Sequence, residues 1–116
     1  MSEDFYCDEV FSGKTPVEKV LETEHVLAYH HTRPLWPVHI VVVPKQHVAS
    51  VLEVNDGLLL ELFSVIKKVA AKVFSETGAE RVLTNLGEYQ DSKHLLFHIN
   101  SGDPKKFTTE DTEITE

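Results

Sequence analysis

The chain of 116 residues carries 11 Lys and Arg against 19 Asp and Glu, which gives a formal net charge of -8. This length suits one domain with a hydrophobic core. The acidic balance argues against duplex nucleic acid or an anionic membrane as a bulk partner, because binding phosphate arrays needs a cationic surface. A small anionic ligand bound in a local pocket is compatible with this net charge.

The cysteine count and the hydropathy pattern indicate where the protein works. Cys7 is the one cysteine, so an internal disulfide is excluded and a reducing compartment is suited. Apolar runs are shorter than 18 residues, and the acidic start Ser2-Glu3-Asp4 does not resemble a signal peptide. We therefore expect a cytoplasmic protein that does not bind nucleic acid or membrane.

The N-terminal half predicts a hairpin. Residues 5–11 mix apolar and acidic side chains and allow a short helix or a strand, and residues 12–16 form a turn. Two short strands follow at residues 17–21 and 25–29, joined by the polar turn at residues 22–24. This spacing indicates an antiparallel pair.

The next segment contains the strongest strand signal in the chain. Residues 32–37 contain two prolines, which favour an extended loop. Residues 38–43 then read Val-His-Ile-Val-Val-Val and end at Pro44. The density of β-branched residues predicts a central strand.

One long helix is predicted after residues 55–57. Apolar residues recur at helical spacing between residues 58 and 74, and Gly78 is the expected C-cap. The members of this stripe are Leu58, Leu59, Leu62, Val65, Ile66, Val69 and Val73. The opposite side carries Lys67, Lys68 and Lys72, which we interpret as a solvated helix face rather than a nucleic-acid patch.

Two further strands are predicted at residues 81–86 and 93–100. In the second, side chains alternate, so that His94, Leu96 and His98 share one face. Leu95, Phe97 and Ile99 share the other face, which we expect to be core. Two imidazoles beside a leucine can be structural histidines bonded to backbone, or they can be what remains of a site.

The elements add up to an α+β domain, a five-stranded antiparallel sheet with one long helix. We expect a single domain over residues 1–104. The remaining residues 105–116 are rich in Thr and acid and predict a flexible acidic tail.

Several segments, in order, resemble the histidine triad (HIT) family in its Hint-like branch. They are residues 27–39 with Tyr29, Pro34, Pro37 and His39, then Pro44-Lys45-Gln46-His47, then residues 81–87, Gln90 and His94. The resemblance covers about residues 5–102. It implies the HIT-like fold and a homodimer whose sheets join across the long helix and the Arg81 strand. It also implies a purine nucleotide as ligand.

The family motif is His-φ-His-φ-His-φ-φ, and this chain reads His94-Leu95-Leu96-Phe97-His98-Ile99-Asn100. In the family the middle histidine attacks the α-phosphorus of the substrate and forms a covalent intermediate. Leu96 stands at that position and has no lone pair to attack with. The resemblance leaves His94, His98 and His39 as the residual catalytic set. It thus implies that covalent nucleotidyl transfer is lost or very weak.

The resemblance also implies a set of nucleotide-binding residues, namely Tyr29, His31, Asn85, Gln90, Asp91 and His98. Two of them depart from the family pattern. His31 stands where an aspartate usually holds the ribose hydroxyls, and Asp91 stands where a serine often touches phosphate. Tyr29 suits a base-stacking wall and a core position about equally, and Trp36 can likewise be a core aromatic.

Some family members bind zinc near the N-terminus, and the matching residues here are Asp4, Cys7, His47 and His94. All three residue types are competent zinc ligands. Aspartate replaces the first cysteine of the family motif, so a plain buried thiol is the favoured interpretation of Cys7, and no metal is included in the expected site.

Three functional hypotheses follow. The first is a nucleotide-binding protein related to nucleoside phosphoramidases and dinucleoside polyphosphate hydrolases. The second is a hydrolase in which His98 or His94 acts as general base on water. The third is a dimeric interaction module that does not act on nucleotides.

Overall fold

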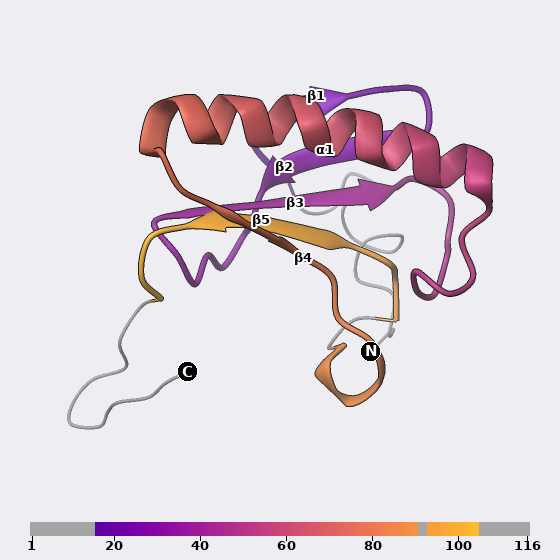
Figure 1. Ribbon diagram of the computed structural model, residues 1–116. Helices are drawn as coiled ribbons and strands as arrows, with labels where there is room; N and C mark the ends of the chain where they lie inside the picture. The colour runs from indigo at the N-terminus through magenta and orange to yellow at the C-terminus, as the bar shows by residue number, and fades with distance from the viewer. Residues whose placement is uncertain (1–15, 91–92, 105–116) are drawn as a thin grey trace.

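The computed structural model describes residues 16–90 and 93–104, and five strands there form one antiparallel sheet in the order β1-β2-β3-β5-β4 (Figure 1). The strands are β1 (Lys19–Glu22), β2 (Val26–His30), β3 (Val38–Pro44), β4 (Arg81–Leu83) and β5 (Phe97–Ser101). The helix α1 (Asp56–Thr77) lies across one face of the sheet, and a short 3-10 turn (Gly87–Tyr89) follows β4. The predicted α+β fold with five strands and one long helix is confirmed.

The strand β3 occupies the middle of the sheet, as its sequence predicts. It pairs with β2 on one side and with β5 on the other. Neighbouring residues Val41 and Val42 point to opposite faces and both are fully buried. A strand covered on both faces needs apolar side chains at consecutive positions, which explains the unbroken β-branched run.

The helix begins and ends where the caps place its limits. The side chain of Asn55 accepts a hydrogen bond from the backbone N–H of Leu58 at 2.8 Å, which satisfies one of the free amides of the first turn. Gly78 follows the last turn with φ of 78°, and its N–H donates to the Phe74 carbonyl. That left-handed conformation favours glycine, so the predicted C-cap is confirmed.

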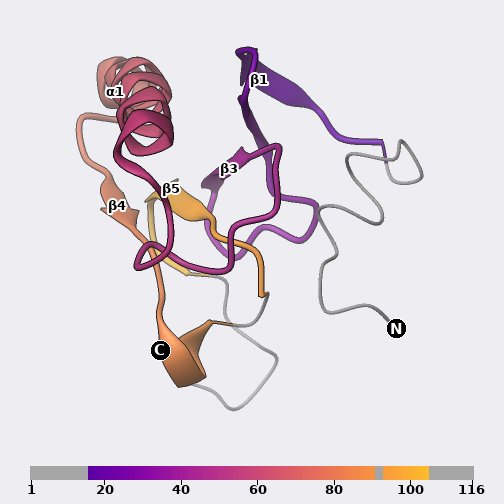
Figure 2. The same cartoon turned by 90° about the vertical axis from the view of Figure 1, so that its right-hand side faces the viewer.

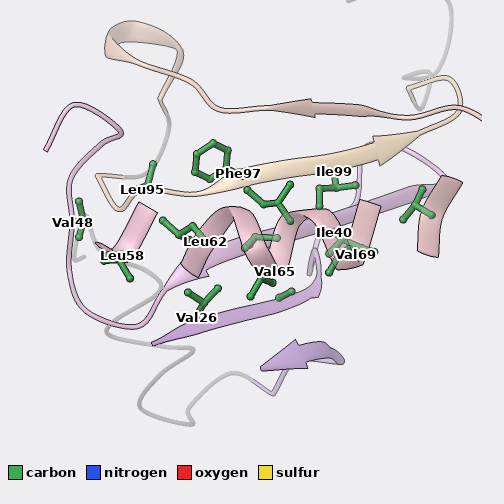
Figure 3. Close-up of a cluster of buried hydrophobic side chains, with 14 residues drawn as sticks. Val26, Ile40, Val48, Leu58, Leu62, Val65, Val69, Leu95, Phe97 and Ile99 are labelled. Carbon is green, nitrogen blue, oxygen red and sulfur yellow. The ribbon is translucent and has the colours of Figure 1, made fainter. Parts of the chain in front are cut away.

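The main core lies between α1 and the sheet (Figure 3). The helix contributes the apolar stripe predicted from its periodicity, and the sheet contributes alternate residues of β2, β3 and β5. Residues on this face include Val26, Ala28, Ile40, Val42, Phe97 and Ile99, with Leu95 and Val48 at one end. The expected inward face of the last strand is therefore confirmed.

The opposite face of the sheet carries a smaller apolar cluster. Leu27 and Tyr29 from β2 pack there with Val41 and Val43 from β3, and Leu96 packs against them. These residues alternate with those of the main core along each strand. The face away from α1 is thus apolar at the β2 side, and the functional side chains described below share it.

The strand β5 begins at Phe97, later than the predicted start at residue 93. The N–H of Leu95 donates to the Val48 carbonyl at 2.6 Å, outside the ladder with β3. The hydroxyl of Thr84 donates to the Leu96 carbonyl at 2.6 Å, beyond the last paired residue of β4. Loop groups rather than a neighbouring strand thus satisfy the Leu95 amide and the Leu96 carbonyl.

The strand β4 is also shorter than predicted, because it ends at Leu83 rather than at residue 86. Beyond it the chain turns through Gly87, whose φ of 65° lies in the left-handed region. Alternating apolar residues alone do not show where pairing stops, since that depends on the neighbouring strand.

The end of β5 is packed against the loop between β2 and β3. Gly102 has a φ of 91°, and a Cβ placed there would lie 2.8 Å from the ring of Pro37. The guanidinium of Arg81 donates to the Gly102 carbonyl and, through Nε, to the Asn100 side chain at 2.8 Å. The loop and the strand end therefore hold each other in place.

Residues 1–15, 91–92 and 105–116 lie outside the described part of the chain, so the expectations for residues 5–11 and for the tail stay predictions. Among the described residues, α1 is too polar to cross a membrane, and no other helix is long enough to do so.

Candidate functional site

Three imidazoles lie in a row on the sheet face that is turned away from α1. His39 comes from β3, His98 comes from β5, and His31 follows directly after β2. The register pairs Val41 with His98, so His39 lies two residues along from that pair on the same face. The rings of His31 and His39 are stacked at 4.3 Å, and those of His39 and His98 are 5.1 Å apart. We call His31, His39 and His98 the imidazole row.

Hydrogen bonds fix where the protons of this row lie. The backbone N–H of Leu35 donates to Nδ1 of His39 at 3.1 Å, and Nε2 of His39 is 2.9 Å from Nδ1 of His98. A backbone N–H can only donate, so in the neutral ring the proton of His39 is on Nε2. His39 then donates to His98, whose own proton is on Nε2. The row therefore presents His98 as an N–H donor.

Burial keeps the middle ring neutral. His39 is nearly fully buried, and this burial, followed by repulsion from His31 and His98, lowers its pKa to about 3. Burial likewise lowers the pKa of His31. At neutral pH these two side chains are uncharged, and their hydrogen bonds follow the neutral tautomers.

His31 is held in the same way as His39. The backbone N–H of Arg33 donates to Nδ1 of His31 at 2.9 Å. The backbone N–H of His31 donates to the backbone carbonyl of His39. Two amides of one loop, at Arg33 and Leu35, thus each cap an Nδ1 atom. The loop between β2 and β3 sets the tautomers of the row.

Leu96 lies on the same side of the chain as His98, two residues before it, and is half-buried. It packs against the small apolar cluster around Tyr29 and Val43. Its isobutyl group brings bulk and no polar atom to this position.

The two predicted aromatic residues have different surroundings. Tyr29 is 1% exposed inside the small apolar cluster, which favours its interpretation as a core residue. Trp36 is half-buried, and its ring meets His39 edge to face with centroids 5.0 Å apart. The Arg81 guanidinium carbon lies over the Trp36 ring, 5.9 Å from its centroid. Trp36 thus packs against the middle ring of the imidazole row.

The structure places His94 away from the row. It precedes β5, is fully buried, and donates through Nε2 to the carbonyl of Pro44 at 2.9 Å. Pro44 ends β3 at the opposite end from His39. His94 therefore matches the structural alternative, a histidine bonded to backbone.

Of the four residues that match the zinc ligands of some family members, Asp4 and Cys7 lie outside the described part of the chain. The rings of His47 and His94 meet edge to face at 5.4 Å. Within residues 16–90 and 93–104, no three His, Cys, Asp or Glu side chains are grouped so that they could hold a metal ion. The Nε2 of His94 is already engaged with the Pro44 carbonyl.

The remaining predicted ligand-binding residues lie along the connection between β4 and β5. Asn85 is half-buried just beyond β4. Gln90 donates from its side chain to the carbonyl of Ala49, which ties the connection to the loop after β3. Asp91 lies outside the described residues.

Two features of the site escape a search for functional side chains. The capping groups at Arg33 and Leu35 are backbone amides, which any residue except proline provides. Asn100 is fully buried beside Arg81, and its Nδ2 has no partner among the described residues. The prolines at residues 34 and 37 indicate a rigid loop, but not the atoms that it directs at the rings.

Comparisons with known proteins show which family the sequence matches. The model of the HIT domain matches residues 12–105. An uncharacterised HIT-like protein of Helicobacter pylori is 33% identical over 98 residues, which are 83% of this chain and 94% of that protein. The adenosine 5′-monophosphoramidase of Schizosaccharomyces pombe is 31% identical and is covered over 70% of its length, against 81% of this chain.

A solved structure shares the fold as well. The HIT family hydrolase from Legionella pneumophila superposes with a TM-score of 0.74 at 28% identity, covering 86% of this chain and 93% of the other. The match to the domain model extends over most of the sequence, and the sheet order and helix agree with the fold expected from it. The chain belongs to the HIT domain family.

Proposed function

We propose that this chain is a nucleotide-binding HIT protein whose ligands are purine nucleoside monophosphates or their phosphoramidate and dinucleoside polyphosphate derivatives. The phosphoryl group would lie beside Leu96 and His98, on the sheet face turned away from α1. The observation that carries the proposal is the chain of hydrogen bonds from Leu35 through His39 to His98, which places the proton of His98 on Nε2. The named activity of the Schizosaccharomyces pombe relative supports the same ligand class.

Leu96 makes the binding role more plausible than efficient turnover. We propose that Leu96 occupies the position of the nucleophile in the HIT motif, and a hydrocarbon side chain cannot attack phosphorus. Positioning and hydrogen bonding would remain, because His39 and His98 are in place. Other enzymes whose catalytic residues have been removed by mutation keep about 10³-fold rate enhancement from such effects. Covalent nucleotidyl transfer is therefore lost or very weak in this proposal.

The tautomer of His98 argues against the hydrolase alternative. A general base must accept a proton, but the Nδ1 of His98 already accepts from His39 and its Nε2 carries the proton. Reversing this order would require a proton on Nδ1 of His39, where the Leu35 amide donates. The Nε2 of His94 donates to a carbonyl. His94 is fully buried and lies away from the imidazole row, so it is not placed to activate a water beside His98.

The test combines binding and turnover. Calorimetry with AMP should show binding to the wild-type protein, whereas an interaction module that does not act on nucleotides would give no heat at millimolar AMP. Turnover of an adenosine phosphoramidate should be close to background in the wild type.

The variant Leu96→His should raise that turnover by at least about tenfold, equivalent to 1.4 kcal/mol of barrier, because an imidazole is restored beside His98. Leu96→Asn is the matched control, since it adds polarity without a nucleophile. Wild-type turnover at the rate of the restored variant would contradict the loss of the nucleophile.

A homodimer through β4 belongs to the same proposal. The outer edge of β4 pairs with no strand among the described residues, and Val82 on it is 43% exposed. Figure 2 shows α1 on the same side of the molecule as β4. The helix carries the exposed rings of Phe63 and Phe74, the latter 59% exposed, and Phe63 lies against Phe97 of β5. A free strand edge beside exposed aromatic rings favours pairing with a second copy.

A further inference from the structure

His31 ends the imidazole row with a donor that no described residue satisfies. Its Nδ1 accepts from the Arg33 amide, so the proton of the neutral ring lies on Nε2. Burial lowers the pKa of this side chain, which keeps the ring neutral at pH 7. Stacking on His39 at 4.3 Å fixes the ring plane. The Nε2–H of His31 is therefore an oriented hydrogen-bond donor.

The spacing within the row suits two separate acceptor groups. The ring centroids of His31 and His98 are 6.4 Å apart, and the ring planes differ by 23°. Both rings carry their proton on Nε2. The oxygens of one phosphate lie closer together than this, because they share a phosphorus atom. The two phosphates of a pyrophosphate share a bridging oxygen and are close as well. Two phosphoryl groups on different carbons of a sugar match the spacing better.

The chemistry of an imidazole N–H also distinguishes between ligand groups. The hydroxyls of a free sugar diol can accept from the His31 N–H, but the capped, protonated ring offers no acceptor for their own protons. A phosphate presents only acceptor oxygens at neutral pH, and hydrogen bonds to a charged acceptor are roughly twice as strong as neutral ones. His31 therefore discriminates in favour of the phosphate.

We propose that His31 selects nucleotides that carry a second phosphoryl group on the sugar, as in a nucleoside 3′,5′-bisphosphate. This inference rests on the proposed function, because it takes the 5′-phosphoryl group to lie beside His98. It names a narrower ligand class and assigns the selectivity to one side chain.

Calorimetry with three adenine nucleotides tests the selection. Adenosine 3′,5′-bisphosphate and ADP are isomers, so they differ in where the second phosphate lies and not in composition. We expect the bisphosphate to bind about tenfold more tightly than AMP, as one charge-assisted hydrogen bond allows. ADP should gain much less. An equal gain for ADP would show that charge alone is responsible and would overturn the inference.

Variants at two adjacent histidines separate His31 from general charge effects. His31→Phe keeps a stacked ring and removes the donor, so the ratio of AMP to bisphosphate dissociation constants should fall to about one. His31→Asp replaces the donor by a carboxylate and should reverse the preference. His30→Phe is the matched control, since His30 lies on the opposite face and lines a separate cleft of about 250 Å³ beside α1.

The outcomes distinguish the two proposals. Binding of AMP without preference for the bisphosphate, or a preference that survives in both His31 variants, would overturn this inference and leave the proposed function intact. No heat with any of the three nucleotides at millimolar concentration would overturn both. The wild-type comparison needs no variant, so the inference stays falsifiable if His31→Asp does not fold, which thermal unfolding would reveal.

Discussion

His39 is a titratable side chain that the fold holds in its neutral form. Both ring nitrogens have hydrogen-bond partners, Leu35 on one side and His98 on the other. Protonation of Nδ1 would set two donors against each other at the Leu35 amide. Burial and this conflict act in the same direction, so the low pKa of His39 is a consequence of its position on the central strand.

The protonation state of His39 can be measured directly. We expect ¹⁵N spectra of the imidazoles to show His39 with a proton on Nε2 alone, without titration between pH 8 and about pH 4, because burial lowers its pKa to about 3. In the unfolded chain the value is near 6.5, so this residue withdraws stability from the folded state as pH falls from about 6.5 towards 3. Titration of His39 near pH 6.5 would refute the proposed tautomers.

At the scale of elements, α1 is tied to the β1–β2 hairpin by one carboxylate. Glu61 accepts hydrogen bonds from the hydroxyl of Thr23, from the backbone N–H of His25 and from Nδ1 of His25 at 2.8 Å. These bonds lower the pKa of Glu61 to about 2, and the hydrogen bond to Glu61 raises the pKa of His25. The hairpin turn and the helix are thereby held together at the edge of the main core.

The clamp between Glu61 and His25 should depend on pH in both directions. Its contribution is present above about pH 4.5 and is lost as pH falls towards 2, because Glu61 is then protonated. It is present below about pH 6.5 and is lost as pH rises through the raised pKa of His25. The difference in Tm between wild type and Glu61→Gln should therefore be largest between pH 4.5 and 6.5.

Glu76→Gln provides the control for this prediction. Glu76 pairs with Lys72 on the exposed face of the same helix at 2.8 Å. Lysine keeps its charge through neutral pH, so the Tm difference for Glu76→Gln should not narrow above pH 6.5. A Tm difference for Glu61→Gln that does not change across the whole pH range would show that the Glu61–His25 interaction does not contribute to stability.

At the scale of the whole molecule, the two long flanks of α1 have different neighbours. One flank faces the β1 side, where Glu61 bonds to His25 of the hairpin and the exposed Lys72 lines a cleft beside β1. The other flank carries Phe63 and Phe74. The ring of Phe63 packs against that of Phe97, with centroids 5.4 Å apart. In Figure 2, α1 and β4 lie on the same side of the molecule, and Phe97 belongs to β5, the strand that pairs with β4.

Charge placed on this surface should separate the proposed dimer. We expect Val82→Lys to shift the protein from dimer to monomer at micromolar concentration, because a charge on an edge strand opposes pairing with a second strand. Sedimentation velocity measures the change. Leu52→Lys is the control, since Leu52 is 80% exposed in the loop before α1 and lies outside the proposed interface. An unchanged sedimentation coefficient for Val82→Lys would exclude this edge as the interface.

The sequence predicts the elements well where local chemistry decides them. The limits of α1 follow from Asn55 and Gly78, and the central place of β3 follows from its β-branched run. Prediction is poorer where a partner decides. The start of β5 depends on the carbonyl of Val48, more than 40 residues away in the chain, and no local pattern reveals that contact.

The candidate site shows the same division. Alternation predicts that His98 and Leu96 share a face, and the register then brings His39 to that face. The role of the loop amides at Arg33 and Leu35 is not encoded in side-chain types, since it depends on how the two prolines direct the backbone. His94 is part of the motif but is directed to Pro44 because the chain has not yet entered the sheet.

The contact between Gly102 and Pro37 links the end of β5 to the positions of the protons in the imidazole row. Only a hydrogen atom fits between the α-carbon of Gly102 and the proline ring, and this ring belongs to the same loop as the amides that cap the two imidazoles. Any larger residue at position 102 must displace that loop or the last strand. A substitution there, remote from every ligand-facing atom, would accordingly look in experiments like damage to a histidine.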